Sequence, residues 1–346
     1  MRPTRRTPWP RPHIRSIAAP AVAAILAAVT AGCGGGGDAS SAPTGAGDKP
    51  RLVASIDMPT PGSPEVAFGS VWVANGPTLT VTRLDPRTNA VTATISTPDP
   101  ASVVSAGAGA VWVTSYPGNS LTRIDPQLNR VTRTISLAPR GAGPIGVTVF
   151  RGFVWVANHD GEPTTSVSKI NPATMRLVDV IPVGSESSAG PVWLVSSAGS
   201  IWTNVNGDPN VVVRINPRTD RVLATVRAPG ACAQLAADNT AVWGAGGGGD
   251  TLCPPGVTRI DPATNRVTKT FNDVGATDAL ALYQGSLWYG TAFNRTLGRI
   301  DTRTNKVVSV LDLPGPAFAM TAGAHAIWTT DRDDQLLFKV LPPTAP

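Results

Sequence analysis

The sequence contains few of the residues on which most enzyme chemistry depends. Among its 346 residues are three His and three Cys, and aromatic residues make up only 5% of the chain. No G-x-S-x-G, Walker, Cys-x-x-Cys or H-E-x-x-H motif is present. The nucleophile elbow, the phosphate-binding loop, the redox dithiol and the zinc-protease helix are therefore excluded in their usual sequence forms. Trp, with nine copies, is the exception to this scarcity, and its distribution indicates the fold.

The chain has little excess of either charge outside its first residues. Its formal net charge is +6, from 29 Lys and Arg against 23 Asp and Glu. Residues 1–32 hold five Arg and no acid, which leaves 24 basic (29 − 5) and 23 acidic residues in the remainder. A nearly neutral domain offers no electrostatic attraction for nucleic acid, so no nucleic-acid partner is expected.

The first apolar run, Ile17–Val29, is too short for a comfortable membrane span. It follows an Arg-rich start and precedes small residues, which is typical of a secretory signal peptide. The run ends in Val29-Thr-Ala-Gly-Cys33. This ending resembles the bacterial lipobox, in which small residues precede a Cys that receives diacylglycerol, although Thr30 stands where that family prefers Leu.

We therefore expect residues 1–32 to be a lipoprotein signal peptide and Cys33 to be the lipidation site. The alternative is a plain signal peptide followed by an incidental Cys. Residues 33–50 are rich in Gly, Ser and Pro and are expected to form a flexible tether. The protein is thus expected to be exported and lipid-anchored at the outer face of the bacterial cytoplasmic membrane or in the cell envelope.

From residue 51 onward the chain repeats itself. Seven apolar–Trp pairs recur at spacings of 40 to 47 residues, with their Trp at Trp72, Trp112, Trp155, Trp202, Trp243, Trp288 and Trp328. This period is typical of propeller blades or helical solenoids. Each unit consists of short alternating runs of Val, Ile, Thr and Trp broken by Gly, Pro, Asn and Asp, which favours strands.

The units predict an all-β fold, a seven-bladed β-propeller of four-stranded antiparallel blades over residues 51–346. In the first unit, strands are expected near 65–68, 71–74, 79–84 and 90–95. The seventh unit has only three, near 317–321, 326–329 and 336–340. Leu52–Ile56 resembles a missing fourth strand, and its insertion as the outer strand of the last blade would close the ring.

A second signature, Asp-Pro-x-Thr-Asn or a close variant of it, joins the third and fourth strands of most units. Its Asp can accept from backbone N–H groups ahead of it, and its Asn tolerates the left-handed conformation that closes a hairpin. The Asp and Asn of the first unit are Asp85 and Asn89, and the same Asn recurs at Asn129, Asn265 and Asn305. Turn chemistry explains the motif without a functional role.

The whole consensus, Val-Trp-Val-Ala/Thr-Asn, loop, Val-x-Arg-Ile-Asp-Pro-x-Thr-Asn, resembles the YVTN β-propeller repeat, with Trp in place of the first aromatic residue. More loosely, it resembles the streptogramin B lyase propellers. The lyase resemblance implies central His residues and a divalent metal at the axis. Beyond the expected signal peptide, however, the chain has only His159 and His325.

The direction of the strands sorts the loops onto two faces. Loops from the second to the third strand, and connections between blades, share one face, on which propellers usually bind ligands near the axis. The candidate ligand residues expected there are Glu65, Asn75, Tyr116, Asn158, His159, Asp278 and Asp331. His325, between a first and a second strand, falls on the opposite face, so a site built from both His is not expected.

Two classes of function fit this arrangement. The first is a binding or scaffold module, expected to be monomeric and cofactor-free, whose partner is an extracytoplasmic protein or a small molecule. The second is a metal-dependent lyase or lactonase with an axial active site. Sugar-lactonase-like propellers hold a divalent cation with carboxylates near the starts of inner strands, where Glu65 and Asp278 lie. The alternative role for these two carboxylates is to satisfy backbone groups at the pore.

A basic residue holds the same position in every third strand. The seven are Arg83, Arg123, Lys169, Arg214, Arg259, Arg299 and Lys339. A basic ring would suit an anion funnel, but such regularity favours packing between blades. We expect these side chains to lie along Trp faces and to pair with the turn Asp.

Cys232 and Cys253 both fall on the ligand-binding face of the fifth unit. In an oxidising compartment, a pair in this arrangement is expected to form a disulfide.

Overall fold

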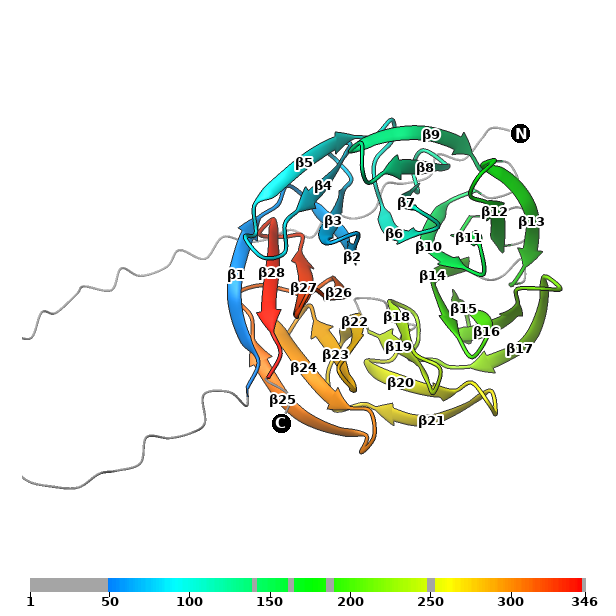
Figure 1. The fold of residues 1–346 in the computed structure, drawn as a ribbon. Coiled ribbons are helices and arrows are strands. Elements are labelled where there is room, and N and C mark those ends of the chain that lie inside the picture. The colour runs from blue at the N-terminus through cyan, green and yellow to red at the C-terminus, as the bar shows by residue number, and fades with distance from the viewer. Residues whose placement is uncertain (1–48, 139–141, 161–164, 185–189, 248–252, 344–346) are drawn as a thin grey trace, which may run out of the picture. The chain divides into compact units, whose positions relative to one another are not determined.

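A computed structural model describes residues 49–138, 142–160, 165–184, 190–247 and 253–343. These residues form seven four-stranded antiparallel sheets arranged in a ring, which confirms the expected seven-bladed propeller (Figure 1). Among them, no helix is long and apolar enough to span a membrane. The expected signal peptide, Cys33 and nearly all of the tether lie outside the described residues.

Each of the first six blades runs from an inner strand at the axis to an outer strand at the rim (Figure 1). Blade 1 is β2 (Pro61–Ala67), β3 (Ser70–Asn75), β4 (Thr80–Leu84) and β5 (Val91–Ser96). Blade 2 is β6 (Val103–Gly107), β7 (Ala110–Ser115), β8 (Ser120–Asp125) and β9 (Arg130–Ser136). Blade 3 is β10 (Pro144–Phe150), β11 (Phe153–Asn158), β12 (Ser166–Asn171) and β13 (Arg176–Pro182).

The same order continues in the next three blades. Blade 4 is β14 (Gly190–Ser197), β15 (Ser200–Asn206), β16 (Val211–Asn216) and β17 (Arg221–Arg227). Blade 5 is β18 (Leu235–Ala237), β19 (Val242–Gly246), β20 (Gly256–Asp261) and β21 (Arg266–Phe271). Blade 6 is β22 (Thr277–Tyr283), β23 (Ser286–Thr291), β24 (Thr296–Asp301) and β25 (Lys306–Asp312).

The seventh blade joins the two ends of the propeller. It contains β26 (Ala319–Gly323), β27 (Ala326–Asp331) and β28 (Leu336–Leu341), and its outer strand is β1 (Arg51–Asp57). β1 pairs antiparallel with β28, with Ser55 opposite Phe338. The predicted closure of the ring by the N-terminal strand is therefore confirmed.

The seven repeated Trp form the core between blades. All are fully buried, and each belongs to an apolar cluster that includes residues of the following blade. Trp72, for example, packs with Val104 and Val111 of blade 2. In five blades the indole N–H also donates to a carbonyl of its own inner strand or of the turn that follows it, as from Trp72 to Ala67 at 3.0 Å. The Trp period therefore corresponds to one buried contact for each blade interface.

The turns between third and fourth strands have the predicted chemistry. Asp85 Oδ1 accepts from the backbone N–H groups of Arg87 and Thr88, at 2.7 and 3.1 Å. Asn89 closes the turn in the left-handed region, with φ of 63°. These donors hold the pKa of the Asp85 carboxyl below its usual value. The ends of the blades that carry these turns, and the turns between first and second strands, are called the turn face below.

Four of the seven basic residues in the third strands connect neighbouring blades. Arg83 lies with its Cζ 4.8 Å from the centre of the Trp72 ring, and its Nη1 donates to the Pro126 carbonyl and to Asn129 Oδ1 of the next blade, both at 2.7 Å. Arg214 and Lys339 make the equivalent pair of bonds. The expected position over a Trp ring is found for six of the seven basic residues, all but Arg123. The expected acceptor was the Asp that begins a turn. The observed side-chain acceptor is instead the residue that ends the turn of the next blade.

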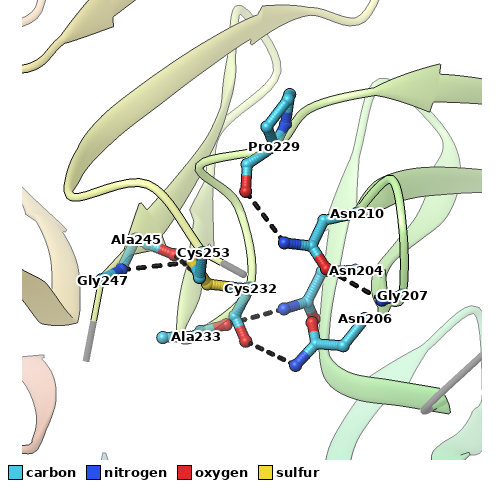
Figure 2. The surroundings of a disulfide bond; sticks show 10 residues. All are labelled: Asn204, Asn206, Gly207, Asn210, Pro229, Cys232, Ala233, Ala245, Gly247 and Cys253. Atoms are coloured by element: carbon cyan, nitrogen blue, oxygen red, sulfur yellow. Dashed lines mark hydrogen bonds between the residues drawn. A yellow bond between two sulfur atoms is a disulfide. The ribbon is translucent and has the colours of Figure 1, made fainter. Parts of the chain in front are cut away.

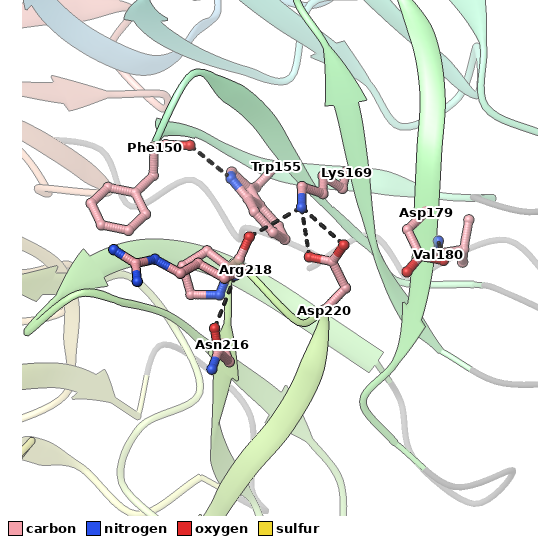
Figure 3. A network of polar contacts seen from close by, with 9 residues as sticks. Phe150, Trp155, Lys169, Asp179, Val180, Asn216, Arg218 and Asp220 are labelled. Carbon is pink, nitrogen blue, oxygen red and sulfur yellow. Dashed lines mark hydrogen bonds and ion pairs between the residues drawn. The ribbon is translucent and has the colours of Figure 1, made fainter.

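Lys169 makes the strongest of these connections (Figure 3). Its Nζ donates to the Pro217 carbonyl at 3.0 Å and forms an ion pair with Asp220 at 2.7 Å, where Asp220 occupies the Asn position of the turn. Arg123 has no such acceptor, since Met175 ends the next turn, and it donates instead to Thr132 of its own blade. Arg259 also donates within its own blade, to Thr268, although Asn305 ends the next turn. The residue that ends the neighbouring turn therefore does not by itself decide whether the connection forms.

Candidate ligand-binding face

The opposite face, called the loop face below, carries the connections from second to third strands and those between blades. Inner strands begin here and lie nearest the centre of the ring (Figure 1). Of the residues predicted to line it, Glu65 lies within β2, opposite Trp72 in the strand register. Its half-buried carboxylate accepts from the backbone N–H of Ala106 in the inner strand of blade 2. Burial raises the pKa of Glu65 to about 7, and the Ala106 bond only partly opposes this.

Asn75 and Asn158 occupy the last position of their second strands and are fully buried. Asn75 Nδ2 donates to the hydroxyls of Thr80 and Thr82, and Asn158 Nδ2 donates in the same way to two Ser hydroxyls of β12. The Oδ1 atoms of both Asn have no hydrogen-bond partner among the described residues. These two residues join the second strand to the third and support the loop between them.

Tyr116 and His159 come together at the junction of blades 2 and 3. Their ring centres are 6.3 Å apart, and the Tyr116 hydroxyl donates to Asp160 Oδ2 at 2.6 Å. This hydrogen bond is the main reason that the pKa of Tyr116 rises to about 12. His159 Nδ1 is buried and finds no partner among the described residues. The cluster thus contains an uncharged Tyr116 phenol and a His159 ring nitrogen that can still donate or accept a hydrogen bond.

Asp278 lies on the other side of the ring, at the start of the inner strand of blade 6. The register of β22 with β23 shifts between Thr277 and Ala279, so Asp278 is the irregular residue of the strand. Its side chain is half-buried. Burial raises the pKa of Asp278 to about 6, and the positive charge of Arg332 opposes this.

Arg332 was not predicted as a site residue. It lies between β27 and β28, and its Cζ is 5.7 Å from the centre of the Phe318 ring. Asp331, the preceding residue, is fully buried and accepts from the backbone N–H groups of Asp333 and Asp334 at 2.9 and 3.1 Å. Asp331 therefore shapes the loop that carries Arg332. The position of Arg332 in a second-to-third-strand loop was the only sequence signal for it.

Gln234, also not predicted, links the inner strands of three blades. It precedes β18 of blade 5, and its Oε1 accepts from the backbone N–H groups of Leu280 and Met320 at 3.2 and 3.1 Å. Its Nε2 donates to the Met320 carbonyl at 2.7 Å. The backbone N–H of Gln234 also donates to the carbonyl of Asp278 at 3.3 Å. Blades 5, 6 and 7 are therefore held together beside Asp278.

Cys232 and Cys253 form a disulfide on this face, with Cα atoms 6.2 Å apart (Figure 2). Asn206 Nδ2 donates to the Cys232 carbonyl at 3.1 Å, and Asn204 Nδ2 donates to the next carbonyl, that of Ala233, at 3.0 Å. The Gly247 N–H points at the Cys253 sulfur, 3.2 Å away. The disulfide and the two Asn together hold the segment that leads into β18 against blade 4.

The predicted residues thus divide into four groups. Tyr116 and His159 form one cluster, Asp278 belongs with Arg332, and Glu65 lies within the inner strand of blade 1. Asn75, Asn158 and Asp331 are buried supports. Two surface hollows lie elsewhere and include none of these residues. The larger, of about 430 Å³, is on the turn face and is lined by Arg83, whose guanidinium already bonds to blade 2.

The chain does not fit the metal implied by the lyase resemblance. His159 follows β11, whereas His325 lies in the turn between β26 and β27, at the opposite end of its blade. In the described part of the chain, no three His, Cys, Asp or Glu side chains come together as a metal site would require. Glu65 and Asp278 belong to blades that are not adjacent.

The sequence matches no protein-family model and no curated protein. Solved structures are similar in fold. A streptogramin B lyase structure aligns over 84% of this chain and 96% of its own, with a TM-score of 0.68 and 16% identity. Kuenenia stuttgartiensis hydrazine synthase aligns over 88% of this chain and 100% of its own, with a TM-score of 0.69 and 14% identity. At these identities, the likeness shows a shared fold and does not carry function to this chain.

Proposed function

We propose that this protein is an exported, lipid-anchored β-propeller that binds a small molecule or an extracytoplasmic protein on its loop face. The observation that carries the proposal is a contrast between the two faces. On the turn face, four of the seven repeated cations bond to the next blade, namely Arg83, Lys169, Arg214 and Lys339. On the loop face, His159 Nδ1 and the side chains of Asp278 and Arg332 make no hydrogen bond to a described residue.

Unpartnered polar groups on a rigid scaffold are what a binding site requires. Most polar groups in folded proteins find partners, so those left without one are candidates for contact with a ligand. The loops that carry them also differ between blades. They begin Asn75-Gly-Pro in blade 1, Ser115-Tyr-Pro in blade 2 and Asn158-His-Asp in blade 3. Variable loops on a regular framework are where propellers hold specificity.

A ligand screen tests this proposal. The Cys33→Ala protein would be screened against a small-molecule library by thermal shift, and hits would be measured by calorimetry. We expect a hit to lose affinity in His159→Ala or in Asp278→Asn, and to keep it in Arg123→Gln, a turn-face variant. If hits bind the loop-face variants normally but lose affinity in Arg123→Gln, the binding face is the other one.

The membrane anchor rests on the sequence pattern of the first 33 residues. Cys33→Ala should shift the protein from the membrane fraction to the soluble or secreted fraction, because several acyl chains on one Cys give stable attachment. Fractionation of cells expressing each form measures this. If both forms partition alike, the lipidation proposal fails, whereas the ligand-binding proposal is unaffected.

A further inference from the structure

We propose that the hollow on the turn face between blades 1 and 2 binds a neutral sugar, with a pyranose ring packed against Phe68. This inference goes beyond the proposed function, because the hollow and the loop face lie on opposite sides of the ring. The hollow has a volume of about 430 Å³, which is in the range of pockets that bind small molecules. Its walls come from turns and strands of both blades, and its lining residues are Phe68, Arg83, Gly109, Asp125, Pro126 and Gln127.

An exposed aromatic ring forms one wall of the hollow. Phe68 lies in the turn between β2 and β3, and 44% of its surface is exposed. The same turn position in five other blades holds Ala108, Arg151, Ala198, Gln284 and Ala324. The turn therefore forms without an aromatic residue. Phe68 adds a flat apolar surface that the repeated fold does not explain, and the C–H face of a sugar ring packs well on such a surface.

Two polar groups of the hollow are held in place and keep unused hydrogen-bonding capacity. Arg83 donates from Nε to Ser70 Oγ at 2.8 Å and from Nη1 to two acceptors of blade 2, whereas its Nη2 makes no hydrogen bond with a described residue. Asp125 Oδ1 accepts from the backbone N–H groups of Gln127 and Leu128, at 2.8 and 3.0 Å, and its Oδ2 has no partner among the described residues. A donor and an acceptor are thus preorganised in one hollow.

The charges around the hollow favour a neutral ligand. Arg83 is positive, and backbone N–H groups hold the pKa of the Asp125 carboxyl below its usual value, so that this group is negative at neutral pH. A simple anion would be attracted by Arg83 and repelled by Asp125, and a simple cation would meet the reverse. A sugar avoids both repulsions, because its hydroxyl oxygens can accept from Nη2 and its O–H groups can donate to Oδ2. The exposed Gln127 amide adds a further donor and acceptor.

The junction of blades 4 and 5 has the same connection between blades but lacks the aromatic ring and the amide. The Arg214 guanidinium bonds to the turn of blade 5 as that of Arg83 bonds to the turn of blade 2. At the positions of Phe68 and Gln127, this junction has Ala198 and Ala263. Neither side chain is therefore needed to join two blades, and replacing either with Ala should leave the fold intact.

Calorimetric titration of the full-length Cys33→Ala protein with sugars at neutral pH tests the site. The probes are glucose, galactose, mannose, N-acetylglucosamine, maltose and cellobiose, with glucosamine and glucuronate as charged analogues of glucose. We expect at least one neutral sugar to bind with a Kd below about 10 mM, the weak limit of a useful small-ligand site. Neither charged analogue should bind more tightly than that sugar.

The variants locate the bound sugar. Phe68→Ala should weaken binding by about tenfold or more, because the surface that packs on the sugar ring is lost. Gln127→Ala should weaken it by about fivefold through the loss of hydrogen bonds. Gln284→Ala and Arg87→Ala change the same two repeat positions in other turns, and these matched controls should bind as the parent does. Thermal melts of each variant separate loss of binding from loss of fold.

Three results would overturn the site. The first is that no neutral sugar binds up to about 10 mM. The second is that a charged analogue binds more tightly than every neutral sugar. The third is that affinity is unchanged in both Phe68→Ala and Gln127→Ala. If sugar binding is lost in His159→Ala but kept in Phe68→Ala, the sugar lies on the loop face, so that the turn-face site is wrong and the proposed function is supported.

Discussion

Glu65 is a carboxylate held where its charge is disfavoured. Burial raises its pKa from 4.5 to about 7, and the backbone N–H of Ala106 opposes this only in part. Asp278 shows a similar shift, from 3.8 to about 6. In both cases the folded protein keeps a proton that the unfolded chain has released. Stability therefore falls as pH rises through the interval between the unfolded and folded pKa values.

Glu65→Gln should remove most of this pH dependence between about 4.5 and about 7. The variant should be more stable than the parent above pH 7, by on the order of 2 kcal/mol, and no more stable near pH 4. Urea denaturation across this range measures the effect. Asp85→Asn, on the turn face, is the control. The pKa of Asp85 is lowered, so the fold favours the charged carboxylate. Removing that carboxylate should therefore not stabilise the protein at high pH. If the free energy of unfolding of Glu65→Gln falls with pH as steeply as that of the parent, Glu65 is not the source of this pH dependence.

The residues of the candidate face were only partly predictable. The register of the repeat was enough to assign Glu65 and Asp278 to inner strands. It could not show that Asn75 points into the blade, since that orientation depends on the hydroxyls of Thr80 and Thr82 in another strand. Arg332 was missed because the loops have no repeated pattern. Its importance depends on Phe318 and Asp278, which a sequence does not place beside it.

At the scale of single elements, the sequence predicted hydrogen bonds between residues close together in the chain. It did not predict contacts between residues far apart in the chain. The Asp-Pro-x-Thr-Asn turns formed as expected because all their partners lie within five residues, as in the bonds from Asp85 to Arg87 and Thr88. The bond from Arg83 to Asn129 joins residues 46 apart and depends on the angle between two blades. Period and strand pattern do not determine that angle.

Blade 5 is the element that most needs added support. Its inner strand, β18, has only three residues, against five to eight in the other blades. The disulfide joins Cys232, just before β18, to Cys253, 21 residues later. It therefore constrains the segment where the strand ladder is shortest.

Replacing both Cys232 and Cys253 with Ser should lower the free energy of unfolding by about 3 kcal/mol in the chain-entropy model for a loop of this length. Denaturation with and without reductant measures the loss. The parent should lose the same stability in reductant, and the double variant should be insensitive to it. A parent protein that melts identically in both conditions would contradict a stabilising disulfide.

On the scale of the whole molecule, closure of the ring depends on β1. Leu52 packs against the cluster that contains Trp288, and Ile56 packs against the cluster that contains Trp328. The strand also supplies the ladder partner of β28. Without it, blade 7 would lose its outer strand and expose an edge.

Deleting Leu52–Asp57 should therefore cost at least about 3 kcal/mol, since it removes two apolar contacts and a complete strand pairing. Deleting residues 34–47, in the expected tether, is the control and should leave the melting temperature nearly unchanged. Scanning calorimetry of both deletions measures the difference. Equal melting temperatures would show that β1 is not needed to close the ring.

The fold was predictable because one pattern occurs seven times, and each copy predicts the same strands. Each Trp occupies an equivalent buried contact with the following blade, so the repeat alone indicates how the blades pack. Function is the part that does not repeat. The loops that carry His159 and Arg332 differ in every blade, and no pattern within the chain indicates the ligand of these residues or of Asp278 in β22.

The contrast between the two faces is tested most directly by the stability of four matched variants under urea denaturation. Arg83→Ala and Lys339→Ala remove connections between blades and should each lose roughly 1–3 kcal/mol. His159→Ala and Arg332→Ala remove side chains that have no hydrogen-bond partner among the described residues, and these variants should stay within about 0.5 kcal/mol of the parent. If the loop-face variants lose as much stability as the turn-face variants, the loop-face groups serve the fold, and the proposal that they are free to bind a ligand is wrong.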